Sequence, residues 1–386
     1  MPRKRTPPKT FPIPPDILQE PDAIPAFWLS TVDEVNRYLD TNLRKGTVAR
    51  IGTSAGGRPI NAACYGTARQ GVGTTTFSGS LGFGNVRAYR GPDSDKTVYV
   101  ALGAVHGGEV EGVMSLVNLL AVLETGSDLR GKPWPDLTAA AARLDRIIVV
   151  PIVNVDGRAR IPLRMFPYRD QDDHVHKYLN TGVWSDGSHI GWPTCKEFIP
   201  LDFARTQFPG GYPNDAGVNF QHDDFLGARQ PETQALLDLV ARERPDLILN
   251  LHTGAPPRDY YIRMHRPLAE PALTPTFEAL YRHVHTTLAL AGCQSTNDPA
   301  VEADPTRPAL SHFNLDTALN LHCGALSTVV EFPSHGFAGT RRDGTVVRQT
   351  PEMILDAGLV LQQAAMQFLA DTGGRQRWTP GRGEKM

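Results

Sequence analysis

Four short apolar segments of the chain have the pattern of buried β-strands. They are TVYVALGA (97–104), RIIVVPIVNVDG (146–157), DLILNLHTG (246–254) and ALSTVVEFP (325–333). Each is a compact run rich in Val, Ile and Leu that ends in polar or glycine-containing residues. This pattern is typical of strands that are covered on both faces. We therefore predict that these four segments are neighbouring strands of one central sheet.

Segments with helical spacing of apolar residues lie between and after these strands. The first strand is followed by a helix over 109–126 that ends at Gly126, and further helices are predicted over 231–245 and 351–374. Before them, a helix follows Ser30 and leads to two alternating segments, VARIGTS and RPINAACYG, which are joined by a turn. The alternation predicts a three-layer α/β/α sandwich with a mixed, mostly parallel central sheet.

The remaining segments define the domain organisation. Residues 1–27 are rich in proline and are predicted to form an N-terminal arm, whereas 375–386 form a C-terminal tail. A single catalytic domain then covers 28–374. Within it, residues 158–216 are rich in Pro, Gly and aromatic residues and have no sustained periodicity. A loop of this length is usually functional, and we predict that it is an insertion that forms the wall of a substrate cleft.

The amino-acid composition indicates which kinds of molecule the protein is expected to bind. The 386 residues are 40% hydrophobic and 21% charged, with 39 basic and 41 acidic side chains. With so small a net charge, the protein has no strong electrostatic attraction to nucleic acid or to an anionic membrane. A peptide or a small molecule is therefore the expected partner. We find no signal peptide or membrane-spanning run and no CxxC pair, which predicts a cytoplasmic protein with reduced thiols.

Polar residues follow the predicted strands at the edge where ligands of α/β sheets bind. His106 and Glu109 come directly after the first strand in VHGGEVEG, and His252 stands in NLHTG. A catalytic zinc ion takes three ligands of these types and leaves one position for water. Glu331, in TVVEFP, is then a candidate general base. The two glycines after His106 are expected to allow a tight turn.

Each of these residues also has a purely structural interpretation. His106 and Glu109 could be a packing pair at a helix start, His252 a hydrogen-bonded histidine in a strand, and Glu331 a member of an ion pair. In DQDDHVHKY, His174 and His176 are expected to be solvated and not to form a second metal site. It is the ordered series of motifs that favours the catalytic interpretation.

That series resembles the carboxypeptidase A-like zinc peptidases over roughly residues 30 to 370. The motifs that resemble the family are, in order, RIGTSAGGRPI, AVHGGEVEG, PIVNVDGR, GVNFQHDDF, RQPETQAL, NLHTG and TVVEFP. The resemblance implies one zinc ion per chain, bound by His106, Glu109 and His252, and activation of water by Glu331. It also implies an arginine that stabilises the oxyanion, for which we favour Arg169 over Arg164.

The chain departs from the family pattern where the substrate is bound. Gln221 and His222 stand where the family has an Asn-Arg pair that clamps the terminal carboxylate, so a bidentate clamp is missing. Asp223 and Asp224 follow and would make this position less favourable for anions. The family tyrosine that closes over the substrate has no clear match. His312 is a possible substitute, with Tyr260 or Tyr261 as contacts from another loop.

Three functions are consistent with these residues. The leading prediction is a zinc-dependent peptidase that hydrolyses a peptide or amide bond with Glu331 as general base. The alternative is a zinc amidohydrolase or deacylase of a small N-acyl substrate, as in the aspartoacylase-like relatives of the fold. A third is a binding module that has lost turnover, against which the complete set of ligands argues. The substrate, its terminal or internal cleavage and the oligomeric state stay open.

Overall fold

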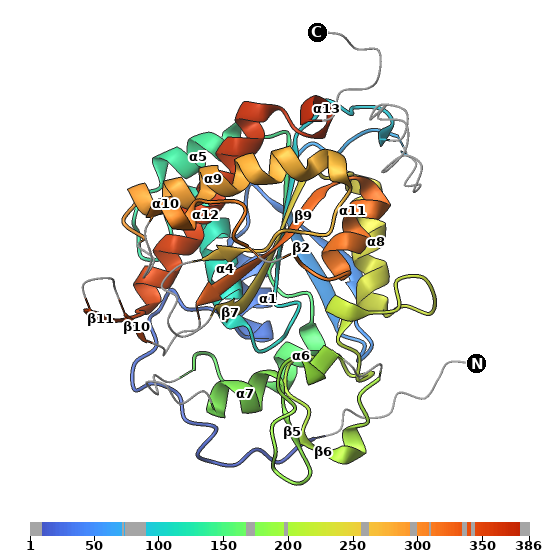
Figure 1. The fold of residues 1–386 in the computed structure, drawn as a ribbon, viewed down its shortest axis with the longest axis vertical. Coiled ribbons are helices and arrows are strands. Elements are labelled where there is room, and N and C mark those ends of the chain that lie inside the picture. Colours follow the sequence, from blue (N-terminus) through green and yellow to red (C-terminus); the bar gives the residue numbers. More distant parts are fainter. Residues whose placement is uncertain are drawn as a thin grey trace.

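A sheet covered by helices on both faces forms the centre of the molecule (Figure 1). The computed structural model describes residues 10–71, 73, 90–166, 174–196, 200–255, 262–293, 299–308, 310–333, 338–340 and 344–378. Within them, seven strands form the sheet in the order β1-β2-β4-β3-β7-β9-β8. The strands are β1 (Thr47–Thr53), β2 (Pro59–Gly66), β3 (Val98–Gly103), β4 (Arg146–Val150), β7 (Leu247–Ala255), β8 (Arg263–Met264) and β9 (Leu326–Pro333).

The pairing of the strands explains why four of them are continuous apolar runs. Strands β4, β3, β7 and β9 are parallel neighbours, and antiparallel strands β2 and β8 flank them on either side. All six residues of β3 are buried, as expected for a parallel strand covered on both faces. This arrangement confirms the predicted mixed sheet, and it places the carboxyl ends of the central strands at one edge.

The helices form the two outer layers. They are α1 (Val32–Asn42), α4 (Val110–Thr125), α5 (Pro135–Ala142), α6 (Val155–Arg160), α7 (His174–Asn180), α8 (Pro231–Glu243), α9 (Thr274–Leu290), α10 (Pro299–Glu302), α11 (Leu315–Cys323), α12 (Pro351–Thr372) and α13 (Arg375–Trp378). Helix α12 packs against α4, α5 and α9, and α8 packs against α11. Figure 1 shows these two groups on opposite sides of the sheet. The predicted three-layer sandwich is therefore confirmed.

Helix ends follow local sequence signals. Thr31 and Glu34 form a reciprocal capping box at the start of α1, and Gly126 ends α4 in the left-handed conformation at φ 84°. Helix α12 is long and apolar enough to cross a bilayer by length and composition. However, 72% of its apolar window is buried inside the fold, which is the character of a core helix.

The segment predicted as an insertion lies beyond the carboxyl edge of the sheet. It contains α7 and a small antiparallel pair, β5 (Val183–Trp184) and β6 (Thr206–Phe208). Figure 1 shows α6, α7, β5 and β6 gathered at this end of the molecule. A separate hairpin is formed by β10 (Ala338–Thr340) and β11 (Val346–Arg348). The N-terminal segment is anchored nearby, where the buried Trp28 donates its indole N–H to the Arg164 carbonyl oxygen at 2.9 Å.

Glu232, in the first turn of α8, connects the helix to the turn between β1 and β2. Its Oε1 accepts from the Ala55 amide at 3.0 Å, and its Oε2 accepts from Asn214 Nδ2 at 3.0 Å. The side chain is fully buried. Burial raises the pKa of the Glu232 carboxyl to about 7, and the charge of Asp156 contributes to the rise.

This raised pKa predicts a pH-dependent stability. The folded state holds the Glu232 proton more tightly than the unfolded state, so this stabilisation is complete below about pH 4.5 and is lost as the pH rises to about 7. One pKa unit corresponds to about 1.4 kcal/mol, so the loss approaches about 3 kcal/mol. Urea unfolding of wild type and Glu232→Gln across this range should show the variant gaining up to this amount relative to wild type. A difference independent of pH would contradict it.

Candidate active site

The segment after β3 is held in place by close contact between glycines. The Gly107 amide donates to the Gly211 carbonyl oxygen at 2.8 Å. A methyl group added to Gly107 would lie 2.1 Å from the Arg158 amide nitrogen, and one on Gly157 would lie 2.2 Å from the Gly211 oxygen. Neither Gly107 nor Gly108 has a positive φ. The chain makes the expected tight turn here, with the Glu109 amide donating to the His106 carbonyl oxygen at 3.1 Å. The glycines are needed because the backbone packs closely around this turn.

This packing brings three predicted metal ligands together. His106 Nδ1 lies 2.9 Å from Glu109 Oε1, and His252 Nδ1 lies 2.9 Å from Glu109 Oε2. The two imidazole Nδ1 atoms are 3.2 Å apart. One donor atom from each residue lies within 4.8 Å of the others, and the described residues contain no second such group. Two imidazoles and a carboxylate are a donor set that zinc prefers.

The pKa values of these three residues are also consistent with a cation-binding site. Burial lowers the pKa of His106, which favours the neutral imidazole. Burial opposes the ionisation of Glu109, but the two imidazoles outweigh it and hold the pKa of this carboxyl well below its usual range. Burial likewise opposes the protonation of His252, yet the Glu109 charge raises its pKa to about 9. A bound cation would replace the proton that Glu109 and His252 share.

Three residues that the sequence analysis did not identify support the ligands. Asn219 Oδ1 lies 3.1 Å from His106 Nε2, and this contact leaves Nδ1 of the imidazole facing Glu109. The Tyr212 ring stacks on His106 with centroids 3.6 Å apart. Asn180 Nδ2 donates to Glu109 Oε1 at 3.4 Å. Asn180 and Tyr212 belong to the predicted insertion, where no periodic pattern signals such a role.

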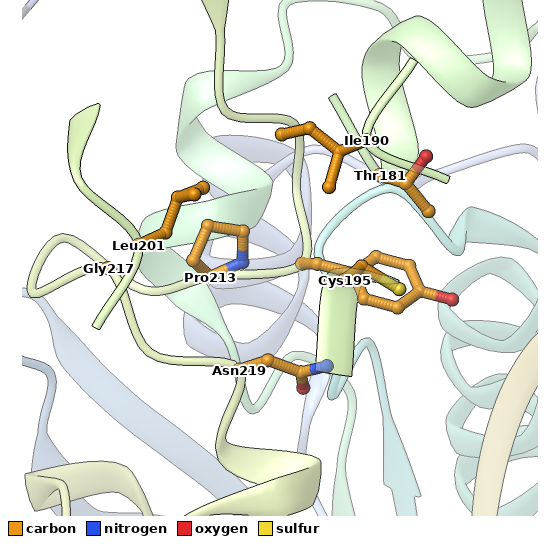
Figure 2. Close-up of a pocket in the computed structure, with 8 residues that line it drawn as sticks. Thr181, Ile190, Cys195, Leu201, Pro213, Gly217 and Asn219 are labelled. Atoms are coloured by element: carbon orange, nitrogen blue, oxygen red, sulfur yellow. The ribbon is translucent and has the colours of Figure 1, made fainter. Parts of the chain in front are cut away.

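A small cavity lies behind these supporting residues. Figure 2 shows Asn219 and Cys195 among the side chains that line it. Its volume is about 10 Å³, enough for about one water molecule. Asn219 Nδ2 is buried and has no hydrogen-bond partner in the described part of the chain. Asn219 thus lines this cavity while its Oδ1 atom faces His106.

Glu331 lies beside the ligands on the neighbouring strand. The register of β7 and β9 pairs it with His252, and both strands continue past these residues, β7 to Ala255 and β9 to Pro333. Glu331 Oε2 is buried without a hydrogen-bond partner among described residues. Burial raises the pKa of this carboxyl to about 7, although His252 lowers it in part. A methyl group on Gly254 would lie 2.8 Å from Oε2, so this glycine leaves room for the carboxylate.

Gln221 was predicted to contact substrate, but its side chain points into the interior of the fold. It is buried, and its Nε2 donates to Asp316 Oδ2 at 3.1 Å. Its Oε1 accepts from Asn250 Nδ2 at 3.2 Å. Both polar groups of Gln221 are therefore used inside the fold. His222, in contrast, is partly exposed.

The other predicted substrate residues are placed differently. Arg164 pairs with Glu34 at 2.6 Å and donates to the Trp28 carbonyl oxygen at 3.2 Å, a placement that does not fit a role in stabilising an oxyanion. His312 is exposed, and its charge contributes to the field at His222. Arg169, like Tyr260 and Tyr261, lies outside the described residues.

The two histidines of DQDDHVHKY, which were not expected to form a metal site, have separate partners in the structure. His174 Nδ1 lies 3.0 Å from His189 Nε2, whereas His176 packs against Phe166 with ring centroids 5.7 Å apart. His174 is exposed. The two histidines of DQDDHVHKY thus have different surroundings and do not form one site with each other.

Comparison with known proteins identifies the family. A profile of the zinc carboxypeptidases matches residues 43–256, more than half of the chain. The chain therefore belongs to the zinc carboxypeptidase family, and its His-Glu-His group is the metal site of an enzyme of that family. No curated protein matches the chain.

Solved structures show the same fold. The chain is similar to the metallo-carboxypeptidase from Burkholderia cenocepacia, with 14% identity and a TM-score of 0.52 over 88% of this chain and 69% of that chain. It is also similar to the metallo-carboxypeptidase from Pseudomonas aeruginosa in complex with (2-guanidinoethylmercapto)succinic acid, with 16% identity and a TM-score of 0.50 over 88% of this chain and 68% of that chain.

Proposed function

We propose that the protein is a zinc-dependent peptidase in which Glu331 is the general base for hydrolysis of a peptide or amide bond. The observation that carries this proposal is the position of Glu331 beside His252 in the β7–β9 register, next to the three convergent ligands. The Oε2 atom of Glu331 has no described hydrogen-bond partner, so it is available to accept a proton. Its pKa of about 7 suits proton transfer near neutral pH.

The residues divide the chemistry between them. His106, Glu109 and His252 would hold one zinc ion per chain, which supplies a Lewis acid that polarises the scissile carbonyl and acidifies water. Glu331 accepts a proton from the attacking water and later delivers it to the leaving amine. Arg169 is assigned to the developing oxyanion, since Arg164 is paired with Glu34. Tyr212 and Asn219 hold His106 in its orientation.

Turnover on a mixed set of peptides and N-acyl amino acids, combined with metal analysis, tests this proposal. We expect about one zinc ion per chain and cleavage of peptides. Cleavage of the N-acyl amino acids alone would instead establish the small-molecule amidohydrolase. A zinc-loaded protein that cleaves neither class would contradict both hydrolase functions and favour a binding module.

A further inference from the structure

Lys196 is a half-buried cation without a charged partner in the described part of the chain. It ends the short helix Thr194–Lys196 of the insertion. Its ammonium nitrogen lies 3.9 Å from the centroid of the Trp192 ring, and no carboxylate of the described residues pairs with it. Burial lowers the pKa of Lys196, because removing the ammonium from water is unfavourable. A partly desolvated cation of this kind gains from binding an anion.

Contacts of Trp192 and Cys195 show on which side of the fold Lys196 lies. Its support, Trp192, is 58% exposed, with its ring centroid 6.3 Å from that of His222. The preceding residue, Cys195, lines the cavity shared with Tyr212 and Asn219, which contact His106. The insertion thus carries Lys196 to the same side of the fold as the metal ligands.

The acidic residues beside His222 accept hydrogen bonds from nearby backbone and side-chain groups. Asp223 Oδ2 accepts from the Gln230 amide at 2.7 Å and from Thr233 Oγ1 at 2.5 Å, so its carboxylate is directed to the start of α8. Asp224 Oδ1 accepts from the Leu226 amide at 3.3 Å. Neither acid pairs with Lys196 in the described part of the chain, and the expectation that they make the position less favourable for anions stays a prediction.

The histidines around the site do not supply the missing charge. Burial lowers the pKa of His222 to about 3, and the charge of Lys196 lowers it further. His265, which follows β8, has its pKa lowered to about 4 by burial, with contributions from His252, Arg263 and Lys196. Both imidazoles are neutral at neutral pH and can donate or accept hydrogen bonds. Among the charged groups that act on His222, Lys196 has the largest effect.

We propose that Lys196, supported by the Trp192 ring, binds a carboxylate of the substrate and so replaces the clamp that Gln221 and His222 do not form. The neutral His222 adds a hydrogen bond to the same carboxylate. The substrate is accordingly a peptide or N-acyl amino acid with a free carboxylate. This inference rests on the proposed function. It means that a residue of the insertion, residues 158–216, determines the preference for a substrate with a free carboxylate.

The test compares one substrate as the free acid and as the C-terminal amide. Loss of a charge-assisted hydrogen bond to the carboxylate lowers kcat/KM by roughly 10- to 150-fold. Wild type should therefore prefer the acid by a factor in this range, and Lys196→Met should reduce the acid-to-amide ratio toward one. Lys196→Arg should restore most of the ratio. An acid-to-amide ratio in Lys196→Met equal to that of wild type would overturn the proposal.

Lys132→Met is a matched control for this change. Lys132 also lies over a tryptophan, 4.7 Å from the Trp134 ring centroid, but it pairs with Asp356 on α12. This variant removes a lysine–tryptophan contact elsewhere in the fold and should keep the wild-type ratio. Zinc content is measured in every variant, so that a misfolded protein is recognised.

A binding measurement separates this proposal from the proposed function. Calorimetry with N-acetyl-phenylalanine and its amide, on the zinc-loaded protein, reports recognition of the carboxylate without turnover. If wild type binds the acid more tightly than the amide and Lys196→Met does not, the anion site is supported. This holds even for a protein that hydrolyses neither compound, and in that case only the proposed peptidase activity is refuted. If amidation weakens binding by the same factor in wild type and in Lys196→Met, Lys196 does not bind the carboxylate. This conclusion holds whether or not the protein cleaves peptides.

Discussion

Glu331→Gln is expected to lower kcat by about 10²- to 10⁴-fold while the protein keeps its zinc. The carboxylate is assigned to proton transfer and not to the metal, whose ligands are His106, Glu109 and His252. Glutamine has nearly the same shape, so it fits the space that Gly254 leaves beside Oε2. Steady-state kinetics on a cleaved peptide, together with metal analysis, measures both parts of the prediction.

A second carboxylate variant controls for the general effect of removing a charge. Glu278, on α9, lies 3.6 Å from Arg266 and is remote from the ligands in the sheet. Glu278→Gln should retain wild-type kcat. If kcat in zinc-loaded Glu331→Gln also stays at the wild-type value, Glu331 has no part in the mechanism.

Removal of zinc by a chelator is expected to lower the rate by at least ~10³-fold, and added zinc should restore it. This estimate follows because a metal ion contributes several kcal/mol to stabilisation of the transition state, and each factor of ten corresponds to about 1.4 kcal/mol. His252→Ala removes one donor of the group and should lower both zinc content and turnover. Metal analysis and kinetics before and after dialysis against the chelator provide the measurement.

The control for this experiment is a histidine elsewhere in the fold. His283, on α9, packs against Phe368 with ring centroids 6.1 Å apart. His283→Ala should bind zinc as wild type does. Full turnover by a metal-free protein would refute the zinc mechanism and, with it, the interpretation of His106 and Glu109.

The sequence predicted those parts of the fold that depend on local pattern. The apolar run of β3 is entirely buried, and the helix predicted after Ser30 is present as α1, with Thr31 as its N-cap. The ligands could also be found, since His106 follows the apolar strand β3 and His252 lies near the end of the apolar strand β7. The strand and the helix cap are each predicted from one short segment, whereas the ligands are recognised only from the ordered series of motifs along the chain.

Other features depend on contacts between distant segments. Nothing near Gln221 in the sequence shows that Asp316 and Asn250 would take up its amide in the interior. Similarly, the stacking of Tyr212 on His106 joins residues more than a hundred positions apart within an aperiodic segment. The register that pairs His252 with Glu331 is a property of the whole sheet. Such contacts could not be predicted from composition or spacing.

The backbone contacts among Gly107, Gly157 and Gly211 restrict how this enzyme can diversify. Three separate parts of the chain meet there without side chains between them, so even an alanine requires a shift of the main chain that carries His106. Mutational drift at this junction would therefore damage the metal site before it could alter substrate choice. New specificities are more accessible through the outer loop that bears Trp192 and Lys196, where side chains can change without moving the catalytic backbone.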